Sequence, residues 1–201
     1  MPKNAQKNIA IVQLKGGEGK TTLAVMTAMM LQCGIVTNER HSPLDQAIPA
    51  NRIVKLEHGE EMPEFPPAVR VVFDMAGFED PRLLSALRQS SVCLVPASCS
   101  FLSLQRTLDT LGVVSGRVDR IAVVANRLES KYPNHAQKIE KVVHAHFPHV
   151  QILPLRRSSI VDRIFMRKES IQEIMVRPGL LSRSYQGFYE EYKKILDFIN
   201  H

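Results

Sequence analysis

Residues 15–22 read Lys-Gly-Gly-Glu-Gly-Lys-Thr-Thr, directly after an apolar run at 9–14 and directly before a run with helical spacing. Glycines permit positive φ and let backbone N–H groups approach an anion closely. The N-terminus of the following helix adds the positive end of its dipole. Lys20 can then reach the β- and γ-phosphates of a nucleotide, and the Thr21 hydroxyl can bind Mg²⁺. This stretch predicts a phosphate-binding loop between a strand and a helix.

Short apolar runs alternate with longer helical periodicities along the rest of the chain. Runs such as "VRVVFD" and "RIAVVAN" are typical of strands that are buried on both faces. We therefore predict an α/β fold with a mostly parallel sheet and helices on both faces. Strands are expected at 9–14, 69–74, 92–96, 121–126 and 150–154, and helices at 19–33, 81–89, 102–114 and 136–147.

The last fifteen residues form an amphipathic helix in this interpretation. Its apolar stripe repeats at steps of three and four and comprises Tyr185, Phe188, Tyr189, Tyr192, Ile195, Leu196 and Ile199. The opposite face is slightly acidic, whereas a membrane-surface helix would carry Lys and Arg there. We expect this helix to pack on the sheet, with a partner-binding or dimer helix as the alternative.

The overall composition is that of a folded globular protein, with 44% hydrophobic residues, 23% charged residues and a net charge of +6. No apolar run is long enough for a membrane span or a signal peptide, so we expect a cytoplasmic protein. The three cysteines, Cys33, Cys93 and Cys99, lack metal-ligand spacing, and the histidines do not converge on a metal. We expect buried, reduced cysteines and no metal beyond the Mg²⁺ of a nucleotide.

Residues 15–22 also match the deviant Walker A pattern K-G-G-x-G-K-[ST]-[ST] at every position, and here the chain resembles the ParA/MinD family of P-loop ATPases. The general pattern G-x-x-x-x-G-K-[ST] is not met, because Leu14 replaces its first glycine and Lys15 follows. The resemblance implies a single P-loop NTPase domain over residues 1–201 that binds ATP and Mg²⁺. It also implies an ATP-dependent homodimer in which Lys15 contacts the nucleotide of the opposite subunit.

Weaker resemblance extends over most of the chain. "VRVVFDMAGFED" resembles the Walker B strand, which implies that Asp74 helps Thr21 to hold Mg²⁺. "IAVVANR" implies that Asn126 hydrogen-bonds adenine with Arg127 alongside, and "ILPLRRSSIVDRIFMRKESI" implies that Pro154 flanks the base. The implied nucleotide-binding residues are Lys15, Gly16, Gly17, Glu18, Gly19, Lys20, Thr21, Thr22, Asn126, Arg127 and Pro154.

One family feature is missing from this sequence. Near the end of its second strand the family carries D-x-D-P, whose first Asp helps to position the attacking water, but this chain reads "GIVTNERHSPLDQA". Glu39 is the best candidate to replace that carboxylate, and Asn38 is the alternative if the register shifts by one. The expected catalytic residues are Lys15, Lys20, Glu39 and Asp74. ATP hydrolysis is the expected activity, with its rate left open.

Basic residues gather late in the chain. Residues 156–183 hold seven Lys or Arg against three Asp or Glu, a local +4 out of +6. One helix over 156–168 would place Arg156, Arg163 and Arg167 within about 40° of one another, with Arg157 and Lys168 in a neighbouring row. Such a row can grip DNA phosphates without reading sequence, and a solvated helix face is the alternative. Resemblance favours DNA, because partition ATPases use a basic surface in this region.

By length and by its late segment the chain looks most like the small plasmid-partition ParA proteins. We expect a DNA-segregation ATPase that dimerises on ATP and binds DNA nonspecifically. It would work with a centromere-binding adaptor protein in the bacterial cytoplasm or at the nucleoid, without binding membrane. The alternative is a MinD-like or conjugation-associated regulator that binds ATP and acts on protein partners with weak or no hydrolysis. A P-loop ligase or kinase would need a pocket of convergent acid and base groups, which the sequence does not indicate.

Overall fold

The chain is described by a computed structural model that covers residues 8–39, 41–77, 80–177 and 179–201. Within these residues seven strands form one sheet in the order β3-β2-β4-β1-β5-β6-β7, and every pair of neighbours is parallel. The strands are β1 (Asn8–Val12), β2 (Gly34–Thr37), β3 (Ile53–Lys55), β4 (Val71–Met75), β5 (Ser90–Ala97), β6 (Arg120–Leu128) and β7 (Gln151–Arg156). The predicted α/β fold with a parallel sheet is confirmed.

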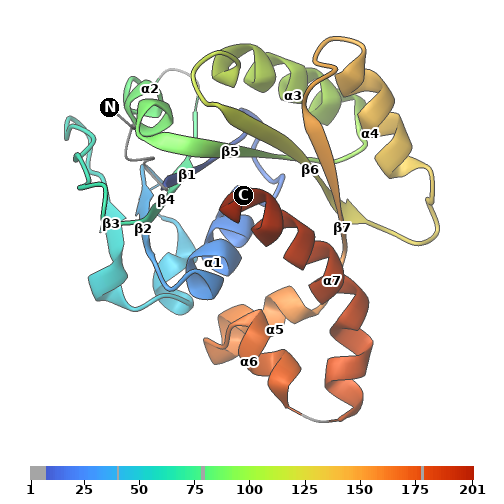
Figure 1. Ribbon diagram of the computed structural model, residues 1–201. Coiled ribbons are helices and arrows are strands. Elements are labelled where there is room, and N and C mark those ends of the chain that lie inside the picture. The colour runs from blue at the N-terminus through green and yellow to red at the C-terminus, as the bar shows by residue number, and fades with distance from the viewer. Residues whose placement is uncertain (1–7, 40, 78–79, 178) are drawn as a thin grey trace.

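Helices cover both faces of this sheet. They are α1 (Lys20–Met30), α2 (Arg82–Arg88), α3 (Phe101–Val114), α4 (His135–His144), α5 (Ile160–Arg167), α6 (Ile171–Val176) and α7 (Leu180–Asn200), with short 3₁₀ helices η1 (Pro43–Gln46) and η2 (Ala50–Arg52) before β3. Figure 1 shows α2, α3 and α4 on one face, and α1 and α7 on the other, with α5 and α6 beside α7.

Two apolar clusters fill the space between sheet and helices. Alternate residues of β1 point to opposite clusters, so Ile9 and Ile11 belong to one and Ala10 and Val12 to the other. The first cluster includes the inner stripe of α7, which packs on the sheet as expected. A buried hydrogen bond of 3.0 Å between the hydroxyls of Thr27 in α1 and Tyr192 in α7 joins these two helices.

The sequence-based boundaries fail in three places. No helix runs over 156–168, because Arg156 ends β7 and α5 begins only at Ile160. Strand β3 and helix α6 were not expected, and both are short, with three and six residues. Helix α7 begins at Leu180, earlier than the apolar stripe indicates.

The sequence also led to expectations about the cysteines, metal ligands and membrane-spanning segments. Cys33 and Cys93 are buried, Cys99 is half-buried, and all three are free. No group of His, Cys, Asp and Glu among the described residues could hold a metal by itself. None of the helices in the described ranges is long and apolar enough to cross a membrane.

Candidate functional site

The phosphate-binding loop lies at the carboxyl end of β1, where neighbouring strands β4 and β5 also end. Gly17 and Gly19 have φ of 80° and 90°, in the left-handed region that favours glycine. Gly19 is the N-cap of α1, and a Cβ there would lie 2.6 Å from Nδ2 of Asn126. Both the backbone angle and the close approach therefore require glycine at this position.

A buried glutamine fixes the start of the loop. Nε2 of Gln13 donates to the backbone oxygen of Pro96 at 2.9 Å and to Oγ1 of Thr107 at 3.0 Å. Its Oε1 accepts from Oγ1 of Thr110 at 3.0 Å and from the backbone N–H of Lys15 at 3.3 Å. Gln13 was not singled out from the sequence, although a single glutamine at the end of an apolar strand was an available signal.

Lys15 and Glu18 pair within the loop. The Lys15 ammonium donates to Oε1 of Glu18, whose side chain is 3% exposed. Burial by itself raises the pKa of Glu18, but polar contacts with Lys15, Ser98 and Ser103 and the charge of Lys15 outweigh burial and lower that pKa. The loop thus holds an ionised carboxylate that points toward the start of α3.

Lys20, Asp74 and Glu39 converge behind the loop. Lys20 is 7% exposed and its Nζ lies 3.7 Å from Oε1 of Glu39. Asp74 is fully buried, and neither carboxylate oxygen has a hydrogen-bond partner of normal geometry within the described residues. Burial raises the pKa of Asp74 to about 6; Glu39 adds to this shift, and Thr21 and Lys20 oppose it. An unpartnered buried carboxylate beside the Thr21 hydroxyl is a donor set that fits Mg²⁺.

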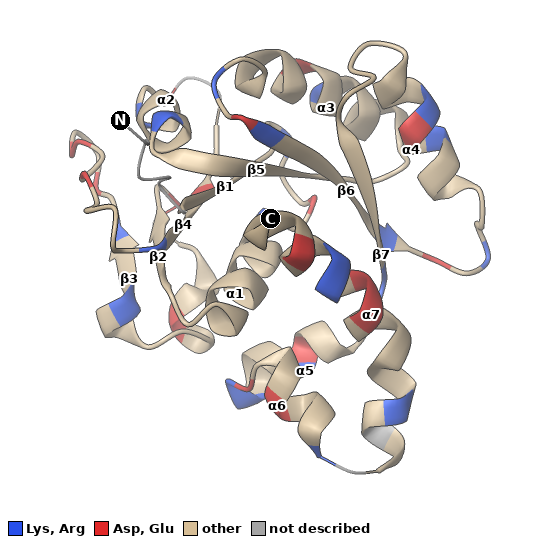
Figure 2. Ribbon diagram, viewed as in Figure 1, with Lys and Arg blue, Asp and Glu red and all other residues tan. Residues whose placement is uncertain are grey.

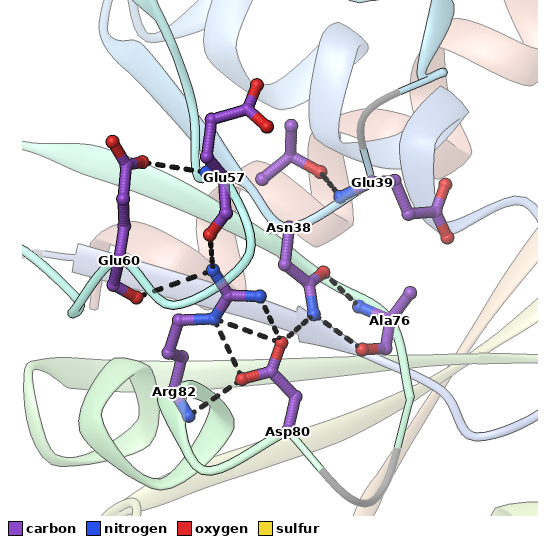
Figure 3. A network of polar contacts seen from close by, with 8 residues as sticks. Asn38, Glu39, Glu57, Glu60, Ala76, Asp80 and Arg82 are labelled. Carbon is purple, nitrogen blue, oxygen red and sulfur yellow. Dashed lines mark hydrogen bonds and ion pairs between the residues drawn. The ribbon is translucent and has the colours of Figure 1, made fainter.

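Asn38 faces away from this centre and binds the loop after β4 (Figure 3). Its Nδ2 donates to the backbone oxygen of Ala76 at 2.7 Å and to Oδ2 of Asp80 at 2.6 Å, and its Oδ1 accepts from the backbone N–H of Ala76 at 2.8 Å. Asp80 is also bound by Arg82, which lowers the pKa of Asp80 to about 2. Asp80 and Arg82 were not singled out from the sequence.

A pocket of about 520 Å³ opens beside the loop. Its lining comes from α1 and its N-cap, the ends of β6 and β7, the start of α5 with the segment before it, and α7: Gly19, Thr22, Leu23, Met26, Asn126, Arg127, Leu155, Arg156, Arg157, Ser158, Ser159, Val161, Asp162 and Phe188. Its walls are partly apolar and Gly19 places it beside the loop, so its dimensions and position suit a nucleoside.

Of the three residues expected beside the base, Asn126 and Arg127 line the pocket and Pro154 does not. Nδ2 of Asn126 donates to the backbone oxygen of Glu18 at 2.8 Å, and Arg127 donates to that of Gly17 at 2.7 Å. Both therefore hold the loop while they line the pocket. Pro154 lies outside the pocket, in a different hollow with Arg120 and Phe198. Leu155 lines the pocket in its place, because successive strand residues point to opposite faces.

The five basic residues expected to bind DNA do not form one helical row. Arg156 is bound by Glu191 of α7, with Nε 2.9 Å and NH2 2.7 Å from Oε1, and Arg157 lies 3.3 Å from Oε1 of Glu129. Arg163 and Arg167 are one turn apart on α5, and Lys168 is its C-cap. Figure 2 shows acidic and basic segments interspersed along α7 rather than separated.

No protein-family model matches this sequence, and no curated protein does. Solved structures do resemble it. Apo McdA from Cyanothece has a TM-score of 0.68 at 11% identity, over 96% of this chain and 99% of that chain. A ParA family ATPase from Chlorobium tepidum has a TM-score of 0.63 at 14% identity, and the match covers 98% of this chain and 100% of that chain. MinD from Pyrococcus horikoshii, complexed with Mg-ADP, has a TM-score of 0.61 at 16% identity, and the match covers 96% of this chain and 98% of that chain.

These likenesses extend along nearly the whole of each chain, although few residues are identical. What they share with this chain is the fold, which here is a parallel sheet with helices on both faces. The chain therefore has the fold of the McdA, MinD and ParA-type P-loop ATPases.

Proposed function

We propose that residues 1–201 form one nucleotide-binding domain that binds ATP with Mg²⁺ and hydrolyses it. The observation that carries this proposal is the convergence of buried Lys20 and buried Asp74 behind a glycine loop with positive φ, next to a pocket of about 520 Å³. Backbone N–H groups of residues 16–22 would bind phosphate oxygens, and Lys20 would neutralise the β- and γ-phosphates. Lys15 would reach the nucleotide of a second subunit.

The Mg²⁺ site of this proposal consists of Thr21 and Asp74. The two unpartnered oxygens of Asp74 would accept hydrogen bonds from water on the ion, and the Thr21 hydroxyl would bind it directly. Held there, Mg²⁺ would offset the negative charge of the phosphates.

Glu39 is the carboxylate that we assign to the attacking water. It lies 3.7 Å from Lys20 and is 39% exposed, so it can face a γ-phosphate, whereas both polar atoms of the Asn38 amide are already bound. The water oxygen would attack the γ-phosphorus, the bond to the bridging oxygen of ADP would break, and Glu39 would orient the water. Of the two alternatives that the sequence offers, we therefore propose Glu39.

The cellular role that we propose is plasmid partition or DNA segregation. ATP would favour a homodimer, and the dimer would bind DNA phosphates nonspecifically through Arg163, Arg167 and Lys168, none of which has an ion-pair partner among the described residues. Hydrolysis, stimulated by a centromere-binding adaptor, would release the DNA. Such a protein would act in the bacterial cytoplasm at the nucleoid.

A second candidate is a MinD-like or conjugation-associated regulator that acts on protein partners. The pairing of Arg156 with Glu191 and of Arg157 with Glu129 favours it, because these pairs leave less free positive charge for DNA. In this alternative ATP binding would control protein contacts, and hydrolysis would be weak.

A DNA-binding titration without nucleotide, with ADP and with ATP separates the candidates. Partition predicts binding that appears with ATP and Mg²⁺, weakens with salt and is lost in Lys20→Ala, while the exposed control Lys141→Ala behaves as the wild type. Equal binding without nucleotide would contradict the switch. ATP binding with no DNA binding would favour the regulator. Phosphate release measured in parallel should be lost in Glu39→Gln and kept in the exposed control Glu64→Gln.

A further inference from the structure

The two loops on either side of the proposed phosphate site are joined by one amide. Asn38 is the first residue after β2 and precedes Glu39, while Ala76 follows β4 and lies two residues after Asp74. The backbone N–H and C=O of Ala76 both bind the Asn38 side chain, at 2.8 Å and 2.7 Å. Thr37 and Asp74 are partners in the β2–β4 register, so this contact lies directly beyond the ends of the two strands.

Asp80 and Arg82 determine which side chain is suitable at position 38. Arg82 binds Asp80 through its backbone N–H at 2.9 Å and through Nε at 2.8 Å and NH2 at 2.7 Å. The same guanidinium donates to the backbone oxygen of Glu57 at 2.7 Å, which fixes it from a third segment (Figure 3). Asp80 is thereby held ionised as an acceptor, so position 38 must supply a donor.

Only an amide at position 38 satisfies all of these neighbours. It must donate to the oxygens of Ala76 and Asp80 and accept from the Ala76 N–H. An aspartate of the same shape would still accept from Ala76, but its second oxygen would face a carbonyl and an ionised carboxylate. Repulsion would then replace two short hydrogen bonds.

This inference rests on the proposed ATP hydrolysis. We propose that Asn38 is a positioning residue, held by Asp80 and Arg82, which fixes the end of β2 against the loop after β4 and so keeps Glu39 beside Lys20. Replacing Asn38 by Asp, although it supplies a carboxylate of the kind that the D-x-D motif carries, would therefore slow hydrolysis instead of restoring a fast reaction. Arg82 acts through Asp80, and neither residue lines the pocket beside the loop.

The test compares Asn38→Asp, Asp80→Asn, the double variant that exchanges the two groups, and the exposed control Asn134→Asp. In the double variant the amide introduced by Asp80→Asn can donate to the carboxylate introduced by Asn38→Asp, which removes the repulsion from residue 80 and leaves that from the Ala76 carbonyl. We expect Asn38→Asp to lower kcat by about 10- to 100-fold with KM for ATP changed by less than about threefold. The double variant should recover part of kcat, and Asn134→Asp should match the wild type.

Hydrogen exchange of the nucleotide-free protein supplies a readout that needs no hydrolysis. In Asn38→Asp, repulsion from Asp80 and the Ala76 carbonyl should push the carboxylate away from the Ala76 N–H, so this amide should exchange faster, and it should exchange more slowly again in the double variant. If kcat of Asn38→Asp equals or exceeds that of the wild type, or if exchange at Ala76 is unchanged, the inference is wrong. Equal losses of ATP affinity, kcat and thermal stability in Asn38→Asp would mean that Asn38 has only a structural role, which would also contradict the inference. If the wild type binds ATP without hydrolysing it, the proposed activity is wrong. Hydrogen exchange alone then decides whether Asn38 holds the loop after β4.

Discussion

The ammonium group of Lys15 binds the carboxylate of Glu18 three residues further along the same loop. A glutamate is an unusual neighbour for phosphate, because its charge repels the anion that the loop would bind. Here the carboxylate is buried and turned toward Ser98 and Ser103, so the backbone N–H groups stay available. Glu18 therefore reduces the positive charge of the site and holds the Lys15 side chain against its own loop.

Replacing Glu18 by Gln should strengthen ATP binding. The variant removes one negative charge from the loop and frees Lys15, and we expect an affinity gain of roughly fivefold, or about 1 kcal/mol. A titration with a fluorescent ATP analogue measures it, with Glu64→Gln as an exposed control. Weaker binding in Glu18→Gln would mean that the pair with Lys15 orders the loop for phosphate.

Replacing Asp74 by Asn should separate Mg²⁺ dependence from folding. ATP affinity should no longer rise when Mg²⁺ is added, because the carboxylate that fits the ion is gone. In the absence of Mg²⁺ at pH 7.5 the variant should be more stable than the wild type by about 1 to 2 kcal/mol, since a buried, unpartnered charge is removed. Urea unfolding tests this, and the exposed Asp119→Asn serves as control. A destabilised Asp74→Asn would contradict the cost assigned to this carboxylate.

Replacing Arg163 and Arg167 together by Ala should weaken DNA binding in the ATP state. Two phosphate contacts would be lost, so the slope of log affinity against log salt should become shallower by about 2. The control is Arg88→Ala on α2, on the opposite face of the sheet. Unchanged affinity and slope would place the DNA surface elsewhere or support the protein-binding alternative.

Acid should remove the stability that Asp80 contributes. Its folded pKa is lowered to about 2 from an ordinary value near 3.8, so the contribution is complete above pH 5 and is lost as the pH falls through 3.8 toward 2. Urea unfolding of wild type and Asp80→Asn should differ by about 1 kcal/mol at pH 6, because the group is partly exposed, and by much less near pH 2.5. A difference that stays constant over this range would mean that the Asp80 charge contributes nothing.

The predictable parts of the fold are those in which local sequence and tertiary structure agree. The runs at 9–14 and 121–126 are apolar at nearly every position and became central strands. Strand β3 could not be found from periodicity, because it has three residues at the sheet edge and its Val54 is 40% exposed. The wrong helix start at Arg156 has a different cause: pairing with Leu128 keeps that residue in β7. Ser158 and Ser159 were the available signal, since Ser favours helix N-caps.

The candidate site also has some residues that could be recognised from the sequence and others that could not. The loop at 15–22 could be found because its glycines and lysines are contiguous. Asp80 and Arg82 could not be recognised, because their contacts with Asn38 and Glu57 join segments that are far apart in the sequence. Gln13 offered only its place at the end of an apolar strand, and its contact with Thr107 is equally distant in the sequence. From the sequence, Asn38 was considered only as a residue that could stand in the place of the missing Asp. Its hydrogen bonds with Ala76 could not be foreseen, because they depend on the β2–β4 pairing.

The position of β1 in the sheet also constrains how the protein is made. Its residues precede those of the other six strands of the described sheet, yet they pair with β4 and β5 and must wait until residue 94 has been added. Helix α1 waits longer, because its buried Thr27 meets Tyr192 of α7. A nascent chain therefore carries the loop at 15–22 without its neighbouring strands until β4 and β5 have been made. The proposed nucleotide site would form only once these distant segments have come together, because domains generally fold as units.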